Sequence, residues 1–248
     1  MKSILITGCN RGLGLGLVKT LLKSDSPPKN LITTCRSVDK ASELQQLASQ
    51  HKNVHIIPLV DVRNTESFDA FAKGVEEIVG SEGLNVLFNN AGYSPKSTRL
   101  GFVKADQLLE TFAVNTVGPI LLTKALLPTL KKAANLNKSG AFGSTKAAVI
   151  NMTSILGSIA LNSDGGLYPY RCSKAAINMA TKSLSKDLKK DGILVACVHP
   201  GWVKTDMGGS NAPMSVEESS RGIVQLMAKL DESHTGGFFQ WDGKELQW

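Results

Sequence analysis

Short runs of apolar, often β-branched residues alternate along the chain with longer segments in which apolar residues recur every three or four positions. The short runs predict strands at Ser3–Thr7, Leu31–Cys35, Val54–Leu59, Asn85–Phe88, Ala148–Thr153, Leu194–His199 and Gly237–Trp241. The longer segments predict helices at Leu13–Leu22, Ala41–Gln50, Thr65–Val79, Asp106–Leu130 (one or two helices), Tyr170–Lys190 and Ser219–Leu230. Because parallel strands need crossover connections, this alternation predicts an α/β fold with a doubly wound parallel sheet and helices on both faces.

The chain contains 248 residues, which is enough to bury a full core. We find no repeat, low-complexity segment or linker that would divide it. We therefore expect a single domain over residues 1–248.

The net charge of +7 comes from scattered residues and short pairs such as Lys131-Lys132. No basic block is interleaved with aromatic residues, so the pattern disfavours a nucleic-acid partner. A basic surface or a ligand that carries phosphate fits the charge better.

The four cysteines lie far apart, without a Cys-x-x-Cys pair or paired histidines, which predicts reduced thiols and no metal site. The N-terminus enters the first strand at once and has no signal-peptide core. No apolar run approaches the length of a membrane span. These features predict a cytoplasmic protein with no membrane partner.

A glycine-rich segment, Thr7–Gly14, follows the first strand and opens the first helix. Glycines at this place let the backbone turn tightly and approach a pyrophosphate on the helix N-terminus. Their spacing is Gly-x-x-x-Gly-x-Gly and not the commoner Gly-x-Gly-x-x-Gly. A plain glycine-rich turn is the alternative, but the position between strand and helix favours a dinucleotide site.

The end of the second strand indicates which dinucleotide is bound. An NAD enzyme would place a carboxylate there, whereas this chain has Arg36, and the nearest acid, Asp39, comes three residues later. A guanidinium suits bidentate contact with a 2′-phosphate, and Arg11 could reach the same group. Both arginines could be surface charges, but together they predict NADPH.

Polar residues also end the next two strands. Asp61 follows the third strand and could accept a hydrogen bond from the adenine amine. Asn89-Asn90-Ala91-Gly92 closes the fourth strand, at the carboxyl edge where ligands bind in open α/β sheets. The asparagines could instead satisfy loop backbone groups.

Tyr170 and Lys174 are four residues apart and fall on one face of the predicted helix. A fixed ammonium beside a tyrosine lowers the phenol pKa from about 10 and makes it a usable acid and base. The same spacing occurs by chance, so the pair alone is weak. Tyr168 is excluded from this pairing because Cys172, and not lysine, lies four residues beyond it.

Taken together, these segments resemble the short-chain dehydrogenases/reductases over essentially the whole chain. The residues and segments that occur in the order and spacing of that family are Thr7–Gly14, Asn89–Gly92, Asn115, Ser154, Tyr170, Lys174 and Pro200-Gly201. The runs Ile4–Leu17 and His199–Gly209 and the terminal Trp248 are similar to the sniffer-type carbonyl reductases. The resemblance implies a Rossmann-like sheet of about seven strands in the order 3-2-1-4-5-6-7.

The family's roles carry over to matching positions only. Tyr170 is then the general acid and base, and Lys174 lowers its pKa and holds the nicotinamide ribose. Ser154 would hydrogen-bond the substrate carbonyl oxygen, and Asn115 would anchor a water in a proton relay. Adjacent strand side chains point to opposite faces and the family places its serine second, so we assign Ser154 and not Thr153.

The resemblance and the motifs together assign the binding of NADPH or NADP+ to a larger set of residues. These are Gly8, Asn10, Arg11, Gly12, Leu13, Gly14, Arg36, Asp61, Val62, Asn89, Asn90, Ala91, Gly92, Tyr170, Lys174, Pro200, Gly201, Val203 and Thr205.

We therefore expect an NADPH-dependent carbonyl reductase that acts on a small aldehyde or ketone and forms a homodimer. An NAD-linked alcohol dehydrogenase and a non-catalytic NADPH sensor are the alternatives. Tyr170 comes 16 positions after Ser154, a few more than is common in the family. We expect the intervening Asn162–Leu167 segment to be a loop that shapes the substrate pocket.

Overall fold

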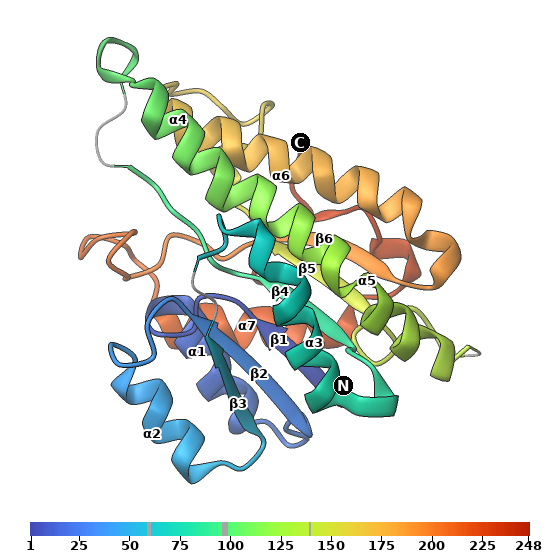
Figure 1. The fold of residues 1–248 in the computed structure, drawn as a ribbon. Coiled ribbons are helices and arrows are strands. Elements are labelled where there is room, and N and C mark those ends of the chain that lie inside the picture. Colours follow the sequence, from blue (N-terminus) through green and yellow to red (C-terminus); the bar gives the residue numbers. More distant parts are fainter. Residues whose placement is uncertain (59–60, 96–98, 139) are drawn as a thin grey trace.

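A single parallel sheet forms the centre of the molecule (Figure 1). The computed structural model describes residues 1–58, 61–95, 99–138 and 140–248. Within these residues seven strands lie in the order β3-β2-β1-β4-β5-β6-β7, which confirms the expected order. They are β1 (Ser3–Ile6), β2 (Asn30–Cys35), β3 (Val54–Pro58), β4 (Val86–Asn89), β5 (Ala148–Met152), β6 (Leu194–His199) and β7 (Phe238–Gln240). The predicted end of the third strand, Leu59, lies outside the described residues.

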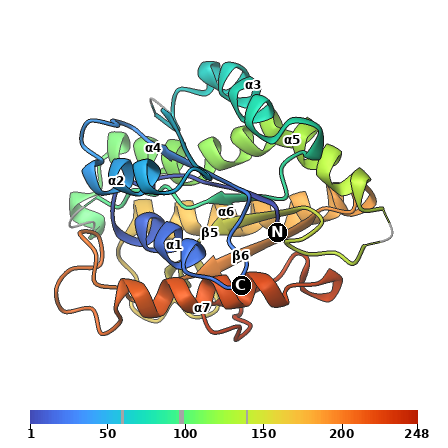
Figure 2. The ribbon, with the colours of Figure 1, turned by 90° about the horizontal axis from the view of Figure 1, so that it is seen from below.

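Helices cover both faces of the sheet. The helices are α1 (Gly12–Leu22), α2 (Ser42–Gln50), α3 (Phe68–Val79), α4 (Ala105–Phe112), α5 (Gly118–Leu136), α6 (Tyr168–Asp187) and α7 (Val216–Lys229). Seen from below, α1 and α7 lie on one side of the sheet and α3 and α5 on the other (Figure 2).

Alternate residues of each strand face opposite layers, as the period of two requires. On β1, Ile4 and Ile6 pack with residues of α1 and α7, whereas Leu5 packs with residues of α3 and α5. Each central strand is buried on both faces, which explains why its sequence is continuously apolar.

Several helix boundaries differ from the prediction by a few residues, and at the starts of α6 and α7 the local sequence gives the reason. Helix α6 begins at Tyr168, two residues early, after Leu167 in a left-handed conformation (φ 49°). Pro169 stands in its first turn, where proline suits a helix start. Helix α7 begins at Val216 because Ser215 caps it, its side chain accepting a hydrogen bond from the Glu218 N–H.

Helices α4 and α5 run on from one another through a π-helical segment, Ala113–Val117. The combined helix Ala105–Leu136 is long and apolar enough to meet a membrane-span criterion by length and composition. Half of its most apolar window is buried, and Leu122, Leu126 and Leu130 lie in the core beside the sheet. A core helix of a globular domain meets the same criterion.

The strand order reverses direction between β1 and β4. Strand β1 pairs with β2 on one side and with β4 on the other, so the connections leave the sheet in opposite directions there. A crevice forms at the carboxyl ends of the strands at such a point. The residues that follow β1, β4, β5 and β6 are therefore brought to one edge.

Candidate active site

Three side chains meet where β5 ends against α6. Tyr170 and Lys174 lie one helical turn apart, and Lys174 Nζ is 5.6 Å from the centre of the Tyr170 ring. Lys174 Nζ also donates a 2.8 Å hydrogen bond to the main-chain oxygen of Met152, the last residue of β5. Ser154 follows two residues later, and its side chain lies close enough to the Tyr170 phenol to lower the phenol pKa. The structure thus brings Ser154, Tyr170 and Lys174 together.

The side chains of Thr153 and Ser154 have different partners. The Ser154 hydroxyl oxygen accepts a 3.2 Å hydrogen bond from the Leu156 N–H, which leaves its proton free to donate. Thr153 Oγ1 donates to Asn178 Oδ1 at 2.6 Å, and both residues are buried. Thr153 therefore fastens β5 to α6. Sequence reasoning missed Asn178, although its spacing of four residues from Lys174 could have placed it on the same helix face.

Burial has the largest effect on the pKa values of Tyr170 and Lys174. It raises the pKa of Tyr170 to about 12, while the hydrogen bond with Ser154 acts in the opposite direction. It also lowers the pKa of Lys174 to about 8. The expectation that the lysine lowers the tyrosine pKa is thus not met, because desolvation of the phenolate outweighs the stabilising contacts.

Asn115 lies in the π-helical segment between α4 and α5 and is buried. Its Nδ2 donates to the Tyr93 main-chain oxygen at 2.8 Å and to Ser173 Oγ at 3.0 Å. Its Oδ1 accepts from the Tyr93 N–H at 2.8 Å. The side chain thus joins the segment after β4 to α6. π-Helical turns of this kind often occur at functional sites.

The glycines of the turn after β1 have backbone conformations or close contacts that disfavour a side chain. Gly8 and Gly12 have φ values of 73° and 57°, in the region that favours glycine. A Cβ on Gly14 would lie 2.1 Å from the Gly8 oxygen. Asn10 and Arg11 lie in the turn itself, and Leu13 is half-buried in the first turn of α1.

The N-terminus of α1 is free to receive an anion. Arg11, at the N-cap, makes no side-chain cap hydrogen bond, and the first turn carries no acidic residue. Helix N–H groups without internal partners attract phosphate. The turn and the helix end together fit the pyrophosphate of a dinucleotide.

The turn after β4 is bonded to the turn after β1. Thr7 Oγ1 accepts hydrogen bonds from the N–H groups of Asn90 and Ala91, at 3.0 and 2.9 Å. Asn90 Nδ2 donates back to the Thr7 oxygen at 2.8 Å. Gly92 lies beyond them, and a Cβ there would be 3.8 Å from Lys174 Nζ. Sequence reasoning missed this role of Thr7, whose hydroxyl beside the first glycine was the available signal.

Asn89 faces away from this edge. It is the last residue of β4, is 3% exposed, and donates from Nδ2 to Asn151 Oδ1 at 2.8 Å. Its side chain belongs to a buried polar network, which leaves its coenzyme contact a prediction.

The residues expected around the adenosine lie at the ends of β2 and β3. Arg36 is exposed directly after β2. Asp61 Oδ2 pairs with Arg63 Nη2 at 2.7 Å, and hydrogen bonds from Arg63, followed by the charges of Arg63 and Arg36, lower the Asp61 pKa. Val62 packs against the Gly118 position at the start of α5. The Asp61 carboxylate therefore already has a partner, which sequence reasoning did not foresee.

The segment after β6 crosses the glycine-rich turn. Gly201 has φ 86°, and Ser219 Oγ donates to the Pro200 oxygen at 2.6 Å. Val203 is buried, and the methyl group of Thr205 lies 3.6 Å from where a Gly12 Cβ would be. Arg11 Nη1 pairs with Asp206 Oδ2 at 2.7 Å rather than standing free for a phosphate.

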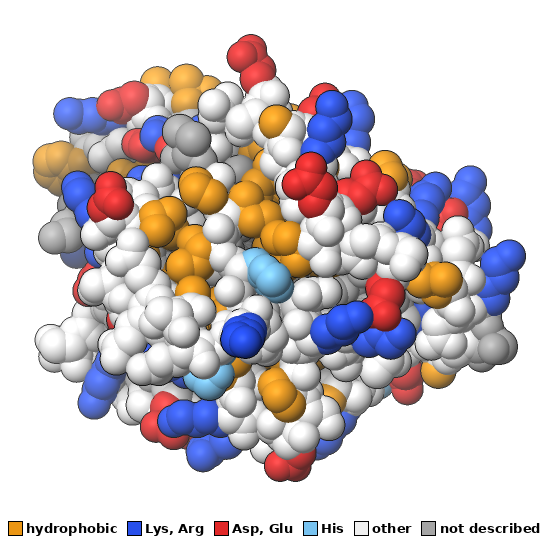
Figure 3. Space-filling model, turned by 60° about the horizontal axis from the view of Figure 1, so that its bottom comes forward, with side chains coloured by type: hydrophobic (Ala, Val, Ile, Leu, Met, Phe, Trp, Pro, Cys, Tyr) orange, Lys and Arg blue, Asp and Glu red, His pale blue; other side chains and the backbone are white. Residues whose placement is uncertain are grey.

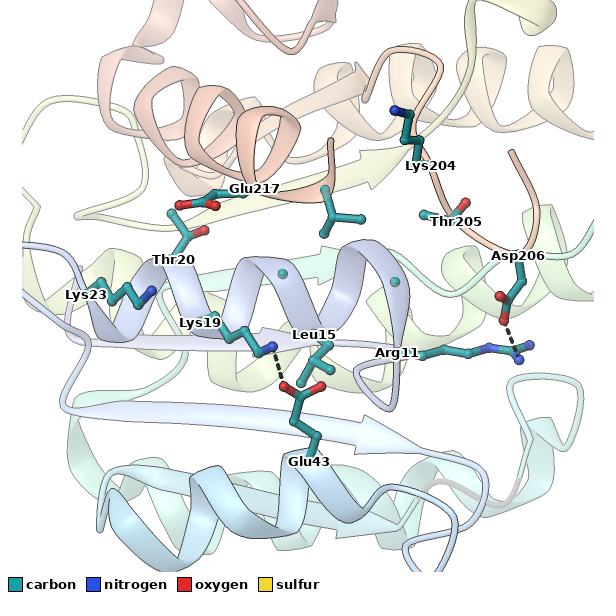
Figure 4. A pocket seen from close by; sticks show the side chains of 13 residues that line it. Arg11, Leu15, Lys19, Thr20, Lys23, Glu43, Lys204, Thr205, Asp206 and Glu217 are labelled. Carbon is teal, nitrogen blue, oxygen red and sulfur yellow. Dashed lines mark hydrogen bonds and ion pairs between the residues drawn. The ribbon is translucent and has the colours of Figure 1, made fainter. Parts of the chain in front are cut away.

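A cavity of about 540 Å³ opens between this segment and α1 (Figure 4). Arg11, Gly12 and Thr205 line it together with Lys19, Glu43, Lys204 and Glu217. The catalytic candidates do not line it, so the cavity borders the expected nucleotide site and not the reacting groups.

A second hollow, of about 510 Å³, lies at the N-terminal end of α6. Arg99 and Leu100 line one part of it and residues 164–168 the other. Gly165 and Gly166 both have φ 63°, and Gly165 N–H donates to Asn162 Oδ1 at 3.1 Å. The Asn162–Leu167 segment is thus a loop beside Tyr168 and Tyr170.

His199 ends β6 directly before Pro200. It is 8% exposed, and its Nδ1 finds no hydrogen-bond partner among the residues that the structure describes. Burial lowers its pKa to about 4. The imidazole is therefore neutral at pH 7.

A family model for short chain dehydrogenases matches residues 2–215. The structure of carbonyl reductase Sniffer of D. melanogaster is 55% identical, covers 100% of both chains and has a TM-score of 0.99. An NADPH-bound carbonyl reductase from chicken fatty liver is 41% identical, with 100% of this chain and 99% of that chain covered and a TM-score of 0.94. The protein C-signal of Myxococcus xanthus is 41% identical over 165 residues, which are 66% of this chain and 93% of C-signal.

The buried His199 predicts a loss of stability in acid. Between pH 6.5 and about 4 the unfolded chain binds a proton at this histidine and the folded chain does not, so the free energy of unfolding falls as pH falls. The full effect is on the order of 3 kcal/mol, from ~1.4 kcal/mol for each pKa unit. We expect His199→Asn to flatten the decline measured by urea unfolding between pH 7 and pH 4. An unchanged decline would show that His199 does not cause it.

Proposed function

The chain belongs to the short-chain dehydrogenase/reductase family, and on that premise we propose that it is an NADPH-dependent carbonyl reductase. Two close structural relatives are carbonyl reductases, and one of them is NADPH-bound. The arrangement of Ser154, Tyr170 and Lys174 is the single observation in this chain that most supports the activity.

Each of these side chains has a separate task in the proposed reduction. When bound, reduced nicotinamide supplies a hydride to the carbonyl carbon of an aldehyde or ketone. The Ser154 hydroxyl, fixed as an acceptor by the Leu156 N–H, directs its own proton to the carbonyl oxygen. Tyr170 gives its phenolic proton to that oxygen as negative charge develops, which completes the alcohol.

Arg36 counts against the NAD-linked oxidative alternative, because an NAD enzyme would have a carboxylate at that position. Burial keeps the Tyr170 phenol protonated at neutral pH, so it holds the proton that reduction requires. A sensor that only binds the coenzyme would need neither Tyr170 nor Ser154 in this arrangement.

Asn115 and Lys174 support the proton donor. The Asn115 amide is engaged with Tyr93 and Ser173, so a relay water would rely on its main-chain carbonyl. Lys174, held by the Met152 carbonyl below Tyr170, would contact the nicotinamide ribose and return a proton to the tyrosine. Its pKa of about 8 suits proton exchange near neutral pH.

Coenzyme choice is proposed to rest on positive charge at the end of β2. Arg36 stands exposed where an NAD enzyme would have a carboxylate, and the α1 N-terminus and glycine turn fit the pyrophosphate. The other residues assigned to the coenzyme would bind it along the same edge of the sheet; they are Gly8, Asn10 to Gly14, Asp61, Val62, Asn90 to Gly92, Pro200, Gly201, Val203 and Thr205. Asn89 also belongs to the assigned set, but its side chain bonds Asn151 in the buried network.

We also propose a homodimer in the cytoplasm. Most of the apolar residues of Asp106–Leu130 pack wholly or partly inside, but Leu109 is 73% exposed, and Met179, on the neighbouring α6, is 67% exposed. The four cysteines are free thiols, as in a reducing compartment. On the face shown in Figure 3, acidic and basic side chains alternate around apolar ones and form no block of one sign.

Tyr170→Phe keeps the ring but removes the proton donor, so kcat should fall by about 10²–10⁴-fold while NADPH binding persists. The matched variant Tyr168→Phe, at an exposed residue two positions earlier, should cost less than about tenfold. NADPH absorbance measures the rate, and coenzyme fluorescence measures binding. The mechanism fails if Tyr168→Phe abolishes turnover and Tyr170→Phe spares it.

Arg36→Asp should weaken NADPH binding by removing a charge-assisted contact and adding repulsion, while NADH binding is less affected or gains. The measurement is the ratio of kcat/KM for the two coenzymes. Arg221→Asp changes net charge equally at an exposed site on α7 and should leave the ratio unchanged. A ratio that does not move in Arg36→Asp refutes this account of specificity.

Sedimentation at micromolar concentration should give about twice the chain mass of 26.5 kDa. Leu109→Glu places a charge on the exposed surface of α4 and α6 that we propose as the dimer contact, and it should yield the monomer. Leu136→Glu alters a side chain of similar exposure (65%) at the far end of α5 and should remain dimeric. A wild-type monomer would rule the dimer out.

A further inference from the structure

Residues 202–214, which we call the β6–α7 loop, form a unit held mainly by its own hydrogen bonds. Its two ends meet, because the Lys204 N–H donates to the Met214 oxygen at 2.9 Å. Within it, Trp202 Nε1 donates to the Gly208 oxygen at 2.8 Å and the Gly208 N–H donates to Thr205 Oγ1 at 3.1 Å. Val203 and Ala212 anchor the loop because they are buried, so only the part between them, residues 204–211, can shift.

Gly201 and Ser215 flank this unit. Gly201, with φ 86°, joins it to β6, and Ser215 caps the helix that follows. A positive φ at glycine tolerates the backbone changes that a hinge requires.

The β6–α7 loop touches the glycine-rich turn at two adjacent points. Thr205 packs beside Gly12, and Asp206 pairs with Arg11. Figure 4 shows the Arg11 and Asp206 side chains reaching toward each other across the mouth of the cavity, one from each wall. The pair therefore joins the two segments between which a nucleotide would pass.

The other charges around the cavity leave this pair intact. Lys19 pairs with Glu43 of α2 at another part of the cavity lining (Figure 4). Among the described residues, Arg11 is the ion-pair partner of Asp206. Their side chains are 67% and 73% exposed, and exposed pairs contribute only about 0–1 kcal/mol. A contact of this size is weak enough to open and close repeatedly.

We propose that Asp206 is a positioning residue: through Arg11 it holds the β6–α7 loop closed over the glycine-rich turn and slows release of the bound nucleotide. This inference rests on the proposed function. It requires no contact between Asp206 and the nucleotide. The competing interpretation is that Asp206 only competes with a 2′-phosphate for the Arg11 guanidinium.

Asp206→Asn tests the proposal by keeping shape and removing charge. The protein is loaded with labelled NADP+ or NAD+, and the release rate is measured after rapid addition of excess unlabelled nucleotide. We expect both nucleotides to leave about 1.4- to fivefold faster, since 0.2–1 kcal/mol for an exposed ion pair corresponds to that range. The release rate of the variant divided by that of the wild type should approach one at about 1 M salt, where exposed charges are screened.

Two further variants control for structure. Asp206→Glu restores the carboxylate and should return release close to the wild-type rate. Glu232→Gln removes a carboxylate from another exposed ion pair, Lys189 with Glu232 at 3.2 Å, and should leave both nucleotide release rates unchanged.

Unchanged release in Asp206→Asn, or equal acceleration in Glu232→Gln, would overturn the proposal. Slower NADP+ release with unaffected NAD+ would overturn it in favour of competition for Arg11. If the wild-type protein bound neither nucleotide, the proposed function itself would fail and this inference with it.

Discussion

The contact of three backbone segments at the ends of β1 and β4 is the constraint on which the crevice depends. A Cβ on Gly14 would lie 2.1 Å from the Gly8 oxygen and 2.8 Å from Asn90 Nδ2, so the two turns and α1 meet without room for another side chain. The Thr7 hydroxyl and the Asn90 amide lock the turns together. The helix end that would receive a pyrophosphate is therefore held at a fixed place above the sheet.

A buried polar network holds the other side of the site. Asn89 bonds Asn151, and Asn151 Nδ2 donates to Thr181 Oγ1 at 2.9 Å, so β4, β5 and α6 are linked in sequence. The hydrogen bond between Thr153 and Asn178 makes a similar link one helical turn nearer to the candidate catalytic residues. Buried groups with such partners fix geometry well, because losing one bond leaves the other partner unsatisfied in a low dielectric. The position of Ser154 against Tyr170 follows from these bonds.

The α/β fold could be predicted from the sequence because the central strands are apolar on both faces and each connection between strands is long enough for a helix. Pairing Tyr170 with Lys174 needed only helical spacing. The start of α6 at Tyr168 was missed although Pro169 suited a first turn. The rise in the Tyr170 pKa could not be predicted, since it depends on burial by distant residues. The pairing of Arg11 with Asp206 is likewise non-local and leaves no pattern in the sequence.

The hydrogen bonds between the turns after β1 and β4 also affect how the protein folds. Thr7 and Asn90 are 83 residues apart in sequence, so their contact closes a long loop at an entropic cost before other groups can bind there. Parallel sheets built from such distant pairs fold slowly relative to locally connected ones. The crevice comes into being only when the chain from β1 to β4 has closed, so a nucleotide recognises the assembled sheet and stabilises it by mass action.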